Sequence, residues 1–384
     1  MEKNNQMRIA LVLYTHGLDY DDRIRKEMLS VMALYPNVSF KVFAVEPKNR
    51  EEKGITSYGV PFFIPYLKTR DLFPSASHTL AKALDFYKSV KKELKDFDAI
   101  WCADIETFPF VLFSKSKHIL WDHHELPLFF TGNPLKKTLF RYLERKVKVM
   151  IHANNARLEF LKKQGMIRHP EKQFVLRNYP QFNEVDSEYD ETYYRFSDWL
   201  KDGKCVYLQG IVSKQRADIE SIESVLSIPG LKAVVVGNTR IDLKDELLSK
   251  YSEQELSERL FFTGRIKQLK TPQYIRKCFL SLVFYKHTSP NNWYCEPNRL
   301  FQNLINENPV VVGNNPPMKE LVEKYGVGVC AETDGRDKDA IVLAINRALA
   351  EFDSIKDSII DYKHQWLWNQ QDPTIGAIIE QLLG

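Results

Sequence analysis

The chain has 384 residues, of which 44% are hydrophobic and 27% are charged, and its formal net charge is +4. This length exceeds what one ordinary hydrophobic core needs, so two domains are expected, and the near-average composition argues against a disordered chain. The charge is well below that of a dedicated nucleic-acid-binding protein, so we expect no nucleic-acid partner.

The chain carries no sign of a disulfide framework or of a membrane span. Its cysteines lie far apart and form no CxxC pair, which argues against zinc sites and redox dithiols. No apolar run approaches the roughly 20 residues that cross a bilayer, and the first residues contain no small-residue cleavage site. We therefore expect a cytoplasmic protein, with a peripheral position on the inner face of the cell membrane as an alternative.

The N-terminal half alternates between strand and helix patterns. Residues 8–14 form a short continuous apolar run, which predicts a buried parallel strand. Further strands are predicted at 39–45, 99–103, 118–123 and 149–154, and helices at 21–33, 77–95 and 134–147. This alternation indicates β-α-β units in a doubly wound sheet, and we place the first domain at 1–180.

The pattern changes near residue 180 and then restarts. Residues 181–203 are polar, acidic and aperiodic, and are predicted to be a linker. A second α/β domain is predicted over 204–360, with its strands at 205–210, 232–237, 259–264, 280–285, 308–313 and 327–332. Residues 361–384 are expected to end in a helix that packs back toward the first domain, with Trp366 and Trp368 buried beneath it.

Several loops of the second domain suit a phosphorylated ligand. Four predicted strands end in glycine, at Gly210, Gly237, Gly264 and Gly313, and ligands of open α/β sheets lie beyond the carboxyl ends of strands.

Two of these loops combine a helix start with cations. After Gly210, Lys214 and Arg216 precede a helix, and Pro297 with Asn298 and Arg299 opens another, so that backbone N–H groups and cations could meet a diphosphate. Ordinary turns between strands and helices remain the alternative for both segments.

The first half contains a histidine between carboxylates at a predicted strand end. His124 lies next to Glu125 and two residues after Asp122, so it is a candidate polariser or proton carrier. A metal site built from Asp122, His123 and His124 is the alternative, although adjacent strand residues point to opposite faces.

Together the segments resemble the GT-B glycosyltransferases, and among them the large retaining glycosyltransferase family 4. In the first half the resemblance rests on the loop with Gly17, a DxRxxKE helix, a strand-end acid, a DxHE element and the stretch 175–180. Its residues are Asp21, Arg23, Lys26, Glu27, Asp104, Glu106, Asp122, His124 and Glu125. In the second half it rests on QGIVSKQR, on FFTGRI and most specifically on EPNRLFQNL with the following NPVVVGNNPPMKELVEKYGVGV.

The resemblance implies two Rossmann-like domains with a cleft between them that closes on the substrates. It implies that Asp122, His124 and Glu125 are catalytic, and that Gly17, Arg23 and Asp104 lie on the acceptor side. The donor would contact Gly210, Lys214, Arg216, Gly237, Thr263, Gly264, Arg265, Ile266, Glu296, Asn298, Arg299, Leu300 and Gln302. It implies no metal and no cofactor beyond the nucleotide-sugar co-substrate.

The sequence departs from the family at two positions. Many members carry two glutamates eight positions apart, where this chain has Tyr294 and Gln302. Gln302 keeps an acceptor oxygen but no charge, and Glu296 is near enough in sequence to substitute for the first glutamate. The donor's base and sugar are therefore open.

A basic segment suggests a membrane partner. Residues 126–149 combine Phe129 and Phe130 with several lysines and arginines, as in a helix that lies on anionic lipid. An amphipathic helix packed by Leu139, Tyr142, Leu143 and Val147 is the alternative.

We expect a glycosyltransferase that moves a sugar from a nucleotide-sugar donor to a hydroxyl of a surface polysaccharide or glycolipid precursor. The alternatives are a nucleotide-sugar epimerase of the same fold and a catalytically silent module that binds a glycan or a partner transferase.

Overall fold

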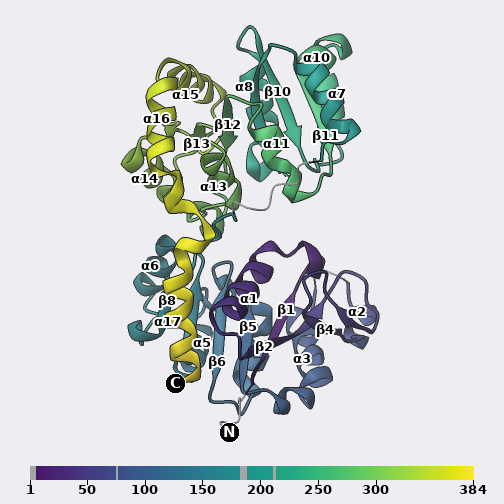
Figure 1. The fold of residues 1–384 in the computed structure, drawn as a ribbon, viewed down its shortest axis with the longest axis vertical. Helices are drawn as coiled ribbons and strands as arrows, with labels where there is room; N and C mark the ends of the chain where they lie inside the picture. Colours follow the sequence, from purple (N-terminus) through teal and green to yellow (C-terminus); the bar gives the residue numbers. More distant parts are fainter. Residues whose placement is uncertain (1–5, 75–76, 182–187, 211–212) are drawn as a thin grey trace. The chain divides into compact units, whose positions relative to one another are not determined.

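The computed structural model describes residues 6–74, 77–181, 188–210 and 213–384. The chain divides into two compact units, Met1–Arg177 with Gln371–Gly384 (unit 1) and Asn178–Gln370 (unit 2). Both are α/β units in which helices surround a twisted sheet (Figure 1).

The described part of unit 1 is built on one eight-stranded sheet. Its strands are β1 (Met7–Tyr14), β2 (Val38–Val45), β3 (Glu52–Ile55), β4 (Pro61–Ile64), β5 (Ala99–Ala103), β6 (Ile119–His123), β7 (Val149–His152) and β8 (Gln173–Val175). The order is β3-β4-β2-β1-β5-β6-β7-β8, parallel except for the pair β3–β4. The order reverses beside β1, whose apolar residues are buried because helices cover both faces of the sheet.

The helices of unit 1 include a return from the end of the chain. They are α1 (Asp22–Leu34), α2 (Lys68–Leu72), α3 (Thr79–Val90), α4 (Phe108–Phe113), α5 (Pro134–Lys146), α6 (Asn155–Lys163) and α17 (Asp372–Leu383). Helix α1 begins where the Asp21 carboxylate accepts a hydrogen bond from the Ile24 amide. Helix α17 packs against α1, as Figure 1 shows in yellow and purple.

Unit 2 has six parallel strands in its described residues. They are β9 (Lys204–Gln209), β10 (Leu231–Val236), β11 (Leu260–Gly264), β12 (Leu280–Val283), β13 (Val310–Val312) and β14 (Gly328–Cys330). The order β11-β10-β9-β12-β13-β14 is that of a Rossmann sheet, with the reversal between β9 and β12. A ligand is expected beyond the carboxyl ends of these two strands.

The helices of unit 2 are α7 (Glu191–Leu200), α8 (Asp218–Leu226), α9 (Leu243–Leu248), α10 (Glu253–Arg259), α11 (Thr271–Ile275), α12 (Pro290–Trp293), α13 (Asn298–Ile305), α14 (Pro316–Tyr325), α15 (Lys338–Ala350) and α16 (Phe352–Tyr362). Helix α14 begins with two prolines and is followed directly by Gly326, whose φ of 65° lets the chain leave the helix. Trp366 and Trp368 are buried, as expected.

The predicted linker 181–203 is wrong in its second half. Residues 191–200 form helix α7, which belongs to unit 2 and buries Phe196 and Leu200 in an aromatic core with Tyr274. The tyrosines and charges of this segment obscured the periodicity, because its apolar face is narrow. Residues 182–187 of the predicted linker lie outside the described residues.

The division between the units differs from the predicted one at the C-terminal end. Residues 361–370, expected to accompany the final helix, stay with unit 2. Gln371 begins the return to unit 1, where its side-chain amide pairs with both the N–H and the C=O of Arg177 at 2.6 and 2.8 Å. Among the described residues, no helix combines the length and apolarity that crossing a bilayer requires.

Candidate functional site

The reversal point of the unit 2 sheet is bridged by one buried arginine. The Arg299 guanidinium donates to the carbonyl of Gln209, the last residue of β9, and to that of Phe284, just after β12, at 3.0 Å for the second bond. Arg299 lies in the first turn of α13 and is 6% exposed. It therefore fastens together the two strand ends beyond which a Rossmann sheet binds its ligand.

A second arginine meets the first at an aromatic ring. Arg216 donates to the carbonyl of Gly210 at 2.6 Å, and its guanidinium faces the Tyr285 ring, which Arg299 also faces. Gly210 has a φ of 60°, and a Cβ there would lie 3.0 Å from the Arg216 Nη1 atom. Neither guanidinium forms an ion pair with a described residue, so two cations share this point without a counter-ion.

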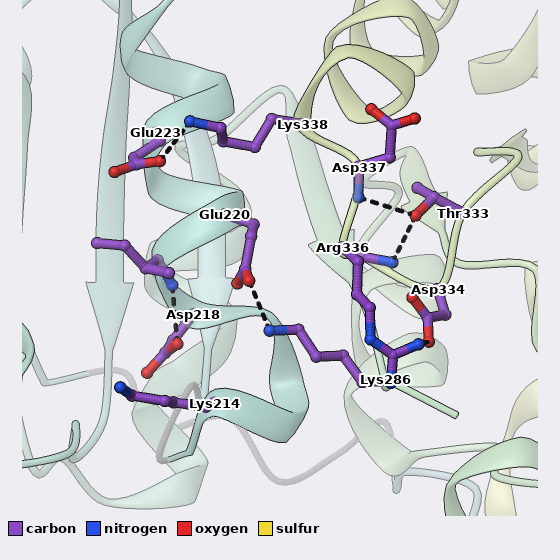
Figure 2. A network of polar contacts seen from close by, with 12 residues as sticks. Lys214, Asp218, Glu220, Glu223, Lys286, Thr333, Asp334, Arg336, Asp337 and Lys338 are labelled. Atoms are coloured by element: carbon purple, nitrogen blue, oxygen red, sulfur yellow. Dashed lines mark hydrogen bonds and ion pairs between the residues drawn. The ribbon is translucent and has the colours of Figure 1, made fainter. Parts of the chain in front are cut away.

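The start of α8 differs from what the sequence suggested. Asp218 is its first residue, is fully buried and forms an ion pair with Arg240. Figure 2 shows the first turns of α8, where Asp218 and Glu220 point toward basic side chains, Glu220 pairing with Lys286 at 2.6 Å. Two carboxylates of α8 itself therefore lie in its first turn, where the sequence predicted a place for a diphosphate. Lys214 is 65% exposed, and its nearest carboxylate is Glu246 at 3.8 Å.

The predicted donor residues Gly237 and 263–266 lie at and just after the ends of β10 and β11. The Gly237 amide donates to the Gly264 carbonyl at 3.1 Å and to Thr263 Oγ1 at 3.3 Å, which ties the two strand ends together. Arg265 is exposed, and Ile266 packs against the aromatic core beneath α7. These residues are thus neighbours of one another at the predicted edge of the sheet.

Around α13 the remaining predicted donor residues divide into two groups. Leu300 and Gln302 are buried in the helix, with exposures of 0% and 8%. Asn298 begins the helix, and its Oδ1 atom is buried without a hydrogen-bond partner among the described residues. Glu296 and Tyr294 are half-buried in the preceding loop.

In unit 1, His124 lies between two carboxylates. Its Nδ1 atom is 3.2 Å from Asp104 and its Nε2 atom is 3.1 Å from Asp122. Burial alone lowers the pKa of His124, but these carboxylates outweigh it, and the pKa lies well above its ordinary value. Each ring nitrogen faces a carboxylate acceptor, so neither nitrogen is left for carrying a proton to or from a substrate.

Arg23, predicted on the acceptor side, is buried behind this histidine. It donates to Asp122 at 3.1 Å and to the Leu176 carbonyl at 3.0 Å, and its Nε atom lies 2.9 Å from the Glu27 carboxyl. Burial and the Asp122 charge raise the pKa of Glu27 to about 8. The pKa of Asp122, which burial would raise, is held below its ordinary value by Arg23 and His124.

The same residues include a possible metal-ligand set. Ligand atoms of Glu27, Asp122 and His124 lie within 4.8 Å of one another. However, the Arg23 guanidinium contacts both carboxyl groups, and a cation in that position opposes a metal ion. His123, weighed as a ligand in the sequence, is buried beside Trp121 and His152, and burial lowers its pKa to about 3.

Asp104 has a backbone conformation that side-chain-bearing residues rarely adopt. Its φ is 63° and its ψ is 174°, a region that costs on the order of 1–3 kcal/mol for a residue other than glycine. Its side chain is 28% exposed and contacts the His124 ring. Asp104 is therefore a support for the site.

Two further acidic residues, Glu106 and Glu125, lie close to Asp104 and His124 in the chain. Glu125 is exposed, and Glu106 is half-buried in the 3-10 turn Ile105–Thr107. Burial, with added repulsion from Asp104 and Glu125, raises the pKa of Glu106.

Gly17, predicted on the acceptor side, has a φ of 140° in the loop after β1.

Two residues of these sites were missed from the sequence. Tyr285 is the last residue of the predicted strand 280–285, and that position was the available signal for its role between the arginines. Glu27 was named in the sequence only as part of the DxRxxKE helix, and nothing local in the sequence shows that its side chain is fully buried.

No family model matches the chain, and no curated protein sequence matches it. Solved structures with a similar fold include a sucrose-phosphate synthase from Thermosynechococcus elongatus, at 12% identity and a TM-score of 0.76 over 98% of this chain and 99% of that one. HepE of Anabaena, solved with UDP-glucose, is 15% identical with a TM-score of 0.69 over 97% and 99%. A UDP-forming α,α-trehalose-phosphate synthase from Burkholderia vietnamiensis is 13% identical with a TM-score of 0.68 over 98% and 99%.

At these identities the similarity concerns the fold. It confirms the predicted fold class of two Rossmann-like parallel-sheet domains of the GT-B type.

Proposed function

We propose that this chain is a glycosyltransferase that moves a sugar from a nucleotide-sugar donor to a hydroxyl acceptor. The observation that carries the proposal is the pair Arg216 and Arg299, two guanidinium groups at the reversal point of a Rossmann sheet that form no ion pair within the described part of the chain. Such a point suits the diphosphate of a nucleotide, since cations and backbone N–H groups meet there. Unit 2 would bind the donor and unit 1 the acceptor.

A UDP-sugar is the first donor to test. HepE was solved with UDP and with UDP-glucose, and the trehalose-phosphate synthase is named as UDP-forming. Isothermal titration of the full chain with UDP, GDP, ADP and CMP should give one clear preference. Four equally weak nucleotides would contradict a donor site in unit 2.

We further propose that transfer needs no metal and no cofactor besides the nucleotide sugar. Arg216 would stabilise the leaving diphosphate electrostatically, in the role that a metal plays in other enzymes. Turnover in the presence of a chelator tests this point, and loss of activity that Mg²⁺ or Mn²⁺ restores would overturn it. Retention of the anomeric configuration, implied by the family 4 resemblance, is tested by NMR of the product.

A catalytically silent module is the second candidate, and Gln302 favours it. Gln302 is buried in α13 without the charge that many family members have at this position. Release of nucleotide diphosphate with and without glycan acceptors separates the candidates. A transferase depends on acceptor, an epimerase converts the donor sugar alone, and a silent module does neither.

The acceptor is proposed to be a surface polysaccharide or glycolipid precursor, reached at an anionic membrane surface through α5. Leu135 and Tyr142 of α5 are 81% and 45% exposed, and the Lys136 ammonium lies over the exposed Phe129 ring. Arg145 lies beside Tyr142, so cationic and apolar groups alternate on the outer surface of this segment.

Other basic residues of α5 point inward, which limits the membrane surface to a few groups. Lys137 binds Gln164, Arg141 binds the Gly165 carbonyl and Lys146 binds the Leu112 carbonyl, at 2.9, 2.9 and 2.6 Å. Co-sedimentation with phosphatidylglycerol vesicles should therefore fall in Lys136→Glu/Arg145→Glu. The charge-matched control Lys244→Glu/Lys267→Glu in unit 2 should bind like the parent chain. Equal binding to neutral and anionic vesicles would remove the electrostatic part of the proposal.

A further inference from the structure

The turn after β5 holds a strained residue with every polar group in use. Asp104 has a φ of 63° and a ψ of 174°. Its N–H donates to the Asp122 carbonyl at 2.7 Å, and its own carbonyl accepts from Trp121 Nε1 at 3.0 Å and from Thr107 Oγ1 at 2.7 Å. Strain of this kind persists only where surrounding contacts over-determine the conformation.

His124 supplies the contacts to the Asp104 side chain. Its backbone N–H donates to Oδ1 at 3.0 Å, and its Nδ1 atom lies 3.2 Å from Oδ2. The opposite ring nitrogen lies 3.1 Å from Asp122, whose other oxygen binds Arg23. The imidazole therefore links the ends of β5 and β6 and is itself fixed from behind.

Two acidic side chains depend on this link. Glu106 lies in the 3-10 turn that begins directly after Asp104, and Glu125 directly follows His124. A shift of either loop would move the corresponding carboxyl group. Among the described residues, the charged or titratable groups that act on the His124 ring include Asp104, Asp122, Arg23, Glu27, Glu106 and His123. From α6, the Arg157 guanidinium donates to the His124 carbonyl.

We propose that Asp104 and His124 are positioning residues that form a catch, in which the two ring nitrogens of His124 bind Asp104 and Asp122 and so hold the strained turn that carries Glu106. The catch sets Glu106 beside Glu125 as a pair of carboxyl groups for the hydroxyl groups of the acceptor. That last role rests on the proposed function, whereas the catch is a property of unit 1 and can be measured without turnover.

Glycine provides the decisive variant, because it adopts a φ of 63° without strain. In His124→Gln, amide hydrogen exchange of residues 105–107 should accelerate by at least about fivefold, the factor that corresponds to the lower end of the expected strain. In Asp104→Gly/His124→Gln, exchange should return toward the parent rate. Glycine adopts this conformation without strain, so the backbone hydrogen bonds to Asp122 and Trp121 are enough to hold the turn. Amides of β2 serve as the internal reference for global destabilisation.

A second measurement examines the imidazole itself. In the full chain labelled with ¹⁵N-histidine, with the signal assigned by its loss in His124→Gln, both ring N–H groups should persist from pH 6 to pH 8. A His124 ring with only one N–H at pH 7 would overturn the double donation to Asp104 and Asp122 on which the catch depends. Unchanged exchange in His124→Gln, or a double variant that exchanges as fast as the single one, would overturn the catch. If these two measurements support the catch but the parent chain transfers no sugar, the result would count against the proposed function alone.

Discussion

Arg216 and Arg299 face the same aromatic ring, with guanidinium carbons 5.4 and 4.8 Å from the Tyr285 centroid. Their hydrogen bonds differ. Arg299 is buried and donates to two backbone carbonyls, whereas Arg216 is half-buried and donates to one. Arg216 therefore keeps more donors for an anion, and Arg299 contributes charge together with structural support.

Replacing Arg216 tests this division at the ligand. Arg216→Ala should weaken UDP binding by about 2 kcal/mol, or roughly thirtyfold, because a charge-assisted contact to the diphosphate is lost. Lys214→Ala is the control, since Lys214 is 65% exposed on the same turn. Calorimetric titration measures both variants, and equal losses would contradict the assignment of Arg216.

Replacing Arg299 should act on stability first. Arg299→Leu leaves the carbonyls of Gln209 and Phe284 without their donor, at a cost of roughly 1–3 kcal/mol each if they stay buried. Urea unfolding of the variant should show this loss in the absence of nucleotide. A variant as stable as the parent chain, with reduced UDP affinity, would show instead that Arg299 acts mainly on the ligand.

The buried carboxyl group of Glu27 should make stability depend on pH. Its pKa is raised from 4.5 to about 8 by burial and by Asp122. Between these values the folded chain keeps a proton that the unfolded chain releases. The free energy of unfolding therefore falls as pH rises, by at most about 1.4 kcal/mol per pH unit.

The variant Glu27→Gln resembles the protonated carboxyl group and removes this term. The free energy of unfolding of the variant minus that of the parent chain should be larger at pH 8 than at pH 5. Urea unfolding of both proteins at both pH values measures this difference. The raised pKa of His124 acts in the same direction and is present in both proteins, and the comparison reports the Glu27 contribution together with its coupling to His124. Parallel stability curves would mean that Glu27 is ionised in the folded chain.

The sequence predicted the parallel sheets well because their strands carry their own signal. A strand buried on both faces, such as β1, is a continuous apolar run. The strands that were missed, β3, β4 and β8, have four residues or fewer, and β3 is largely exposed. Short or exposed strands depend on their neighbours for pairing, and no local pattern marks them.

The sequence predicted where the candidate site residues lie more readily than what each of them does. The positions of Arg216, Arg299 and His124 at strand or helix ends could be derived from the alternation of elements. Which of their donors remain available could not be derived, because the partners are backbone carbonyls such as that of Phe284, and backbone partners leave no trace in residue identity. The strain at Asp104 could not be predicted for a related reason. A positive φ is expected from sequence only where the residue is glycine, and this position has an aspartate.

The correction at α7 leads to a final prediction. Phe196 is fully buried against Tyr274 and Phe261, so the segment taken for a linker is part of the unit 2 core. Phe196→Ala should lower the free energy of unfolding by about 3–5 kcal/mol, as for other buried phenylalanines. The control Tyr194→Ala lies on the same helix, where its side chain is 58% exposed, and should cost less than about 1 kcal/mol. If both variants unfolded like the parent chain, α7 would be a dispensable connection, and the aromatic core beneath it would contribute nothing to unit 2.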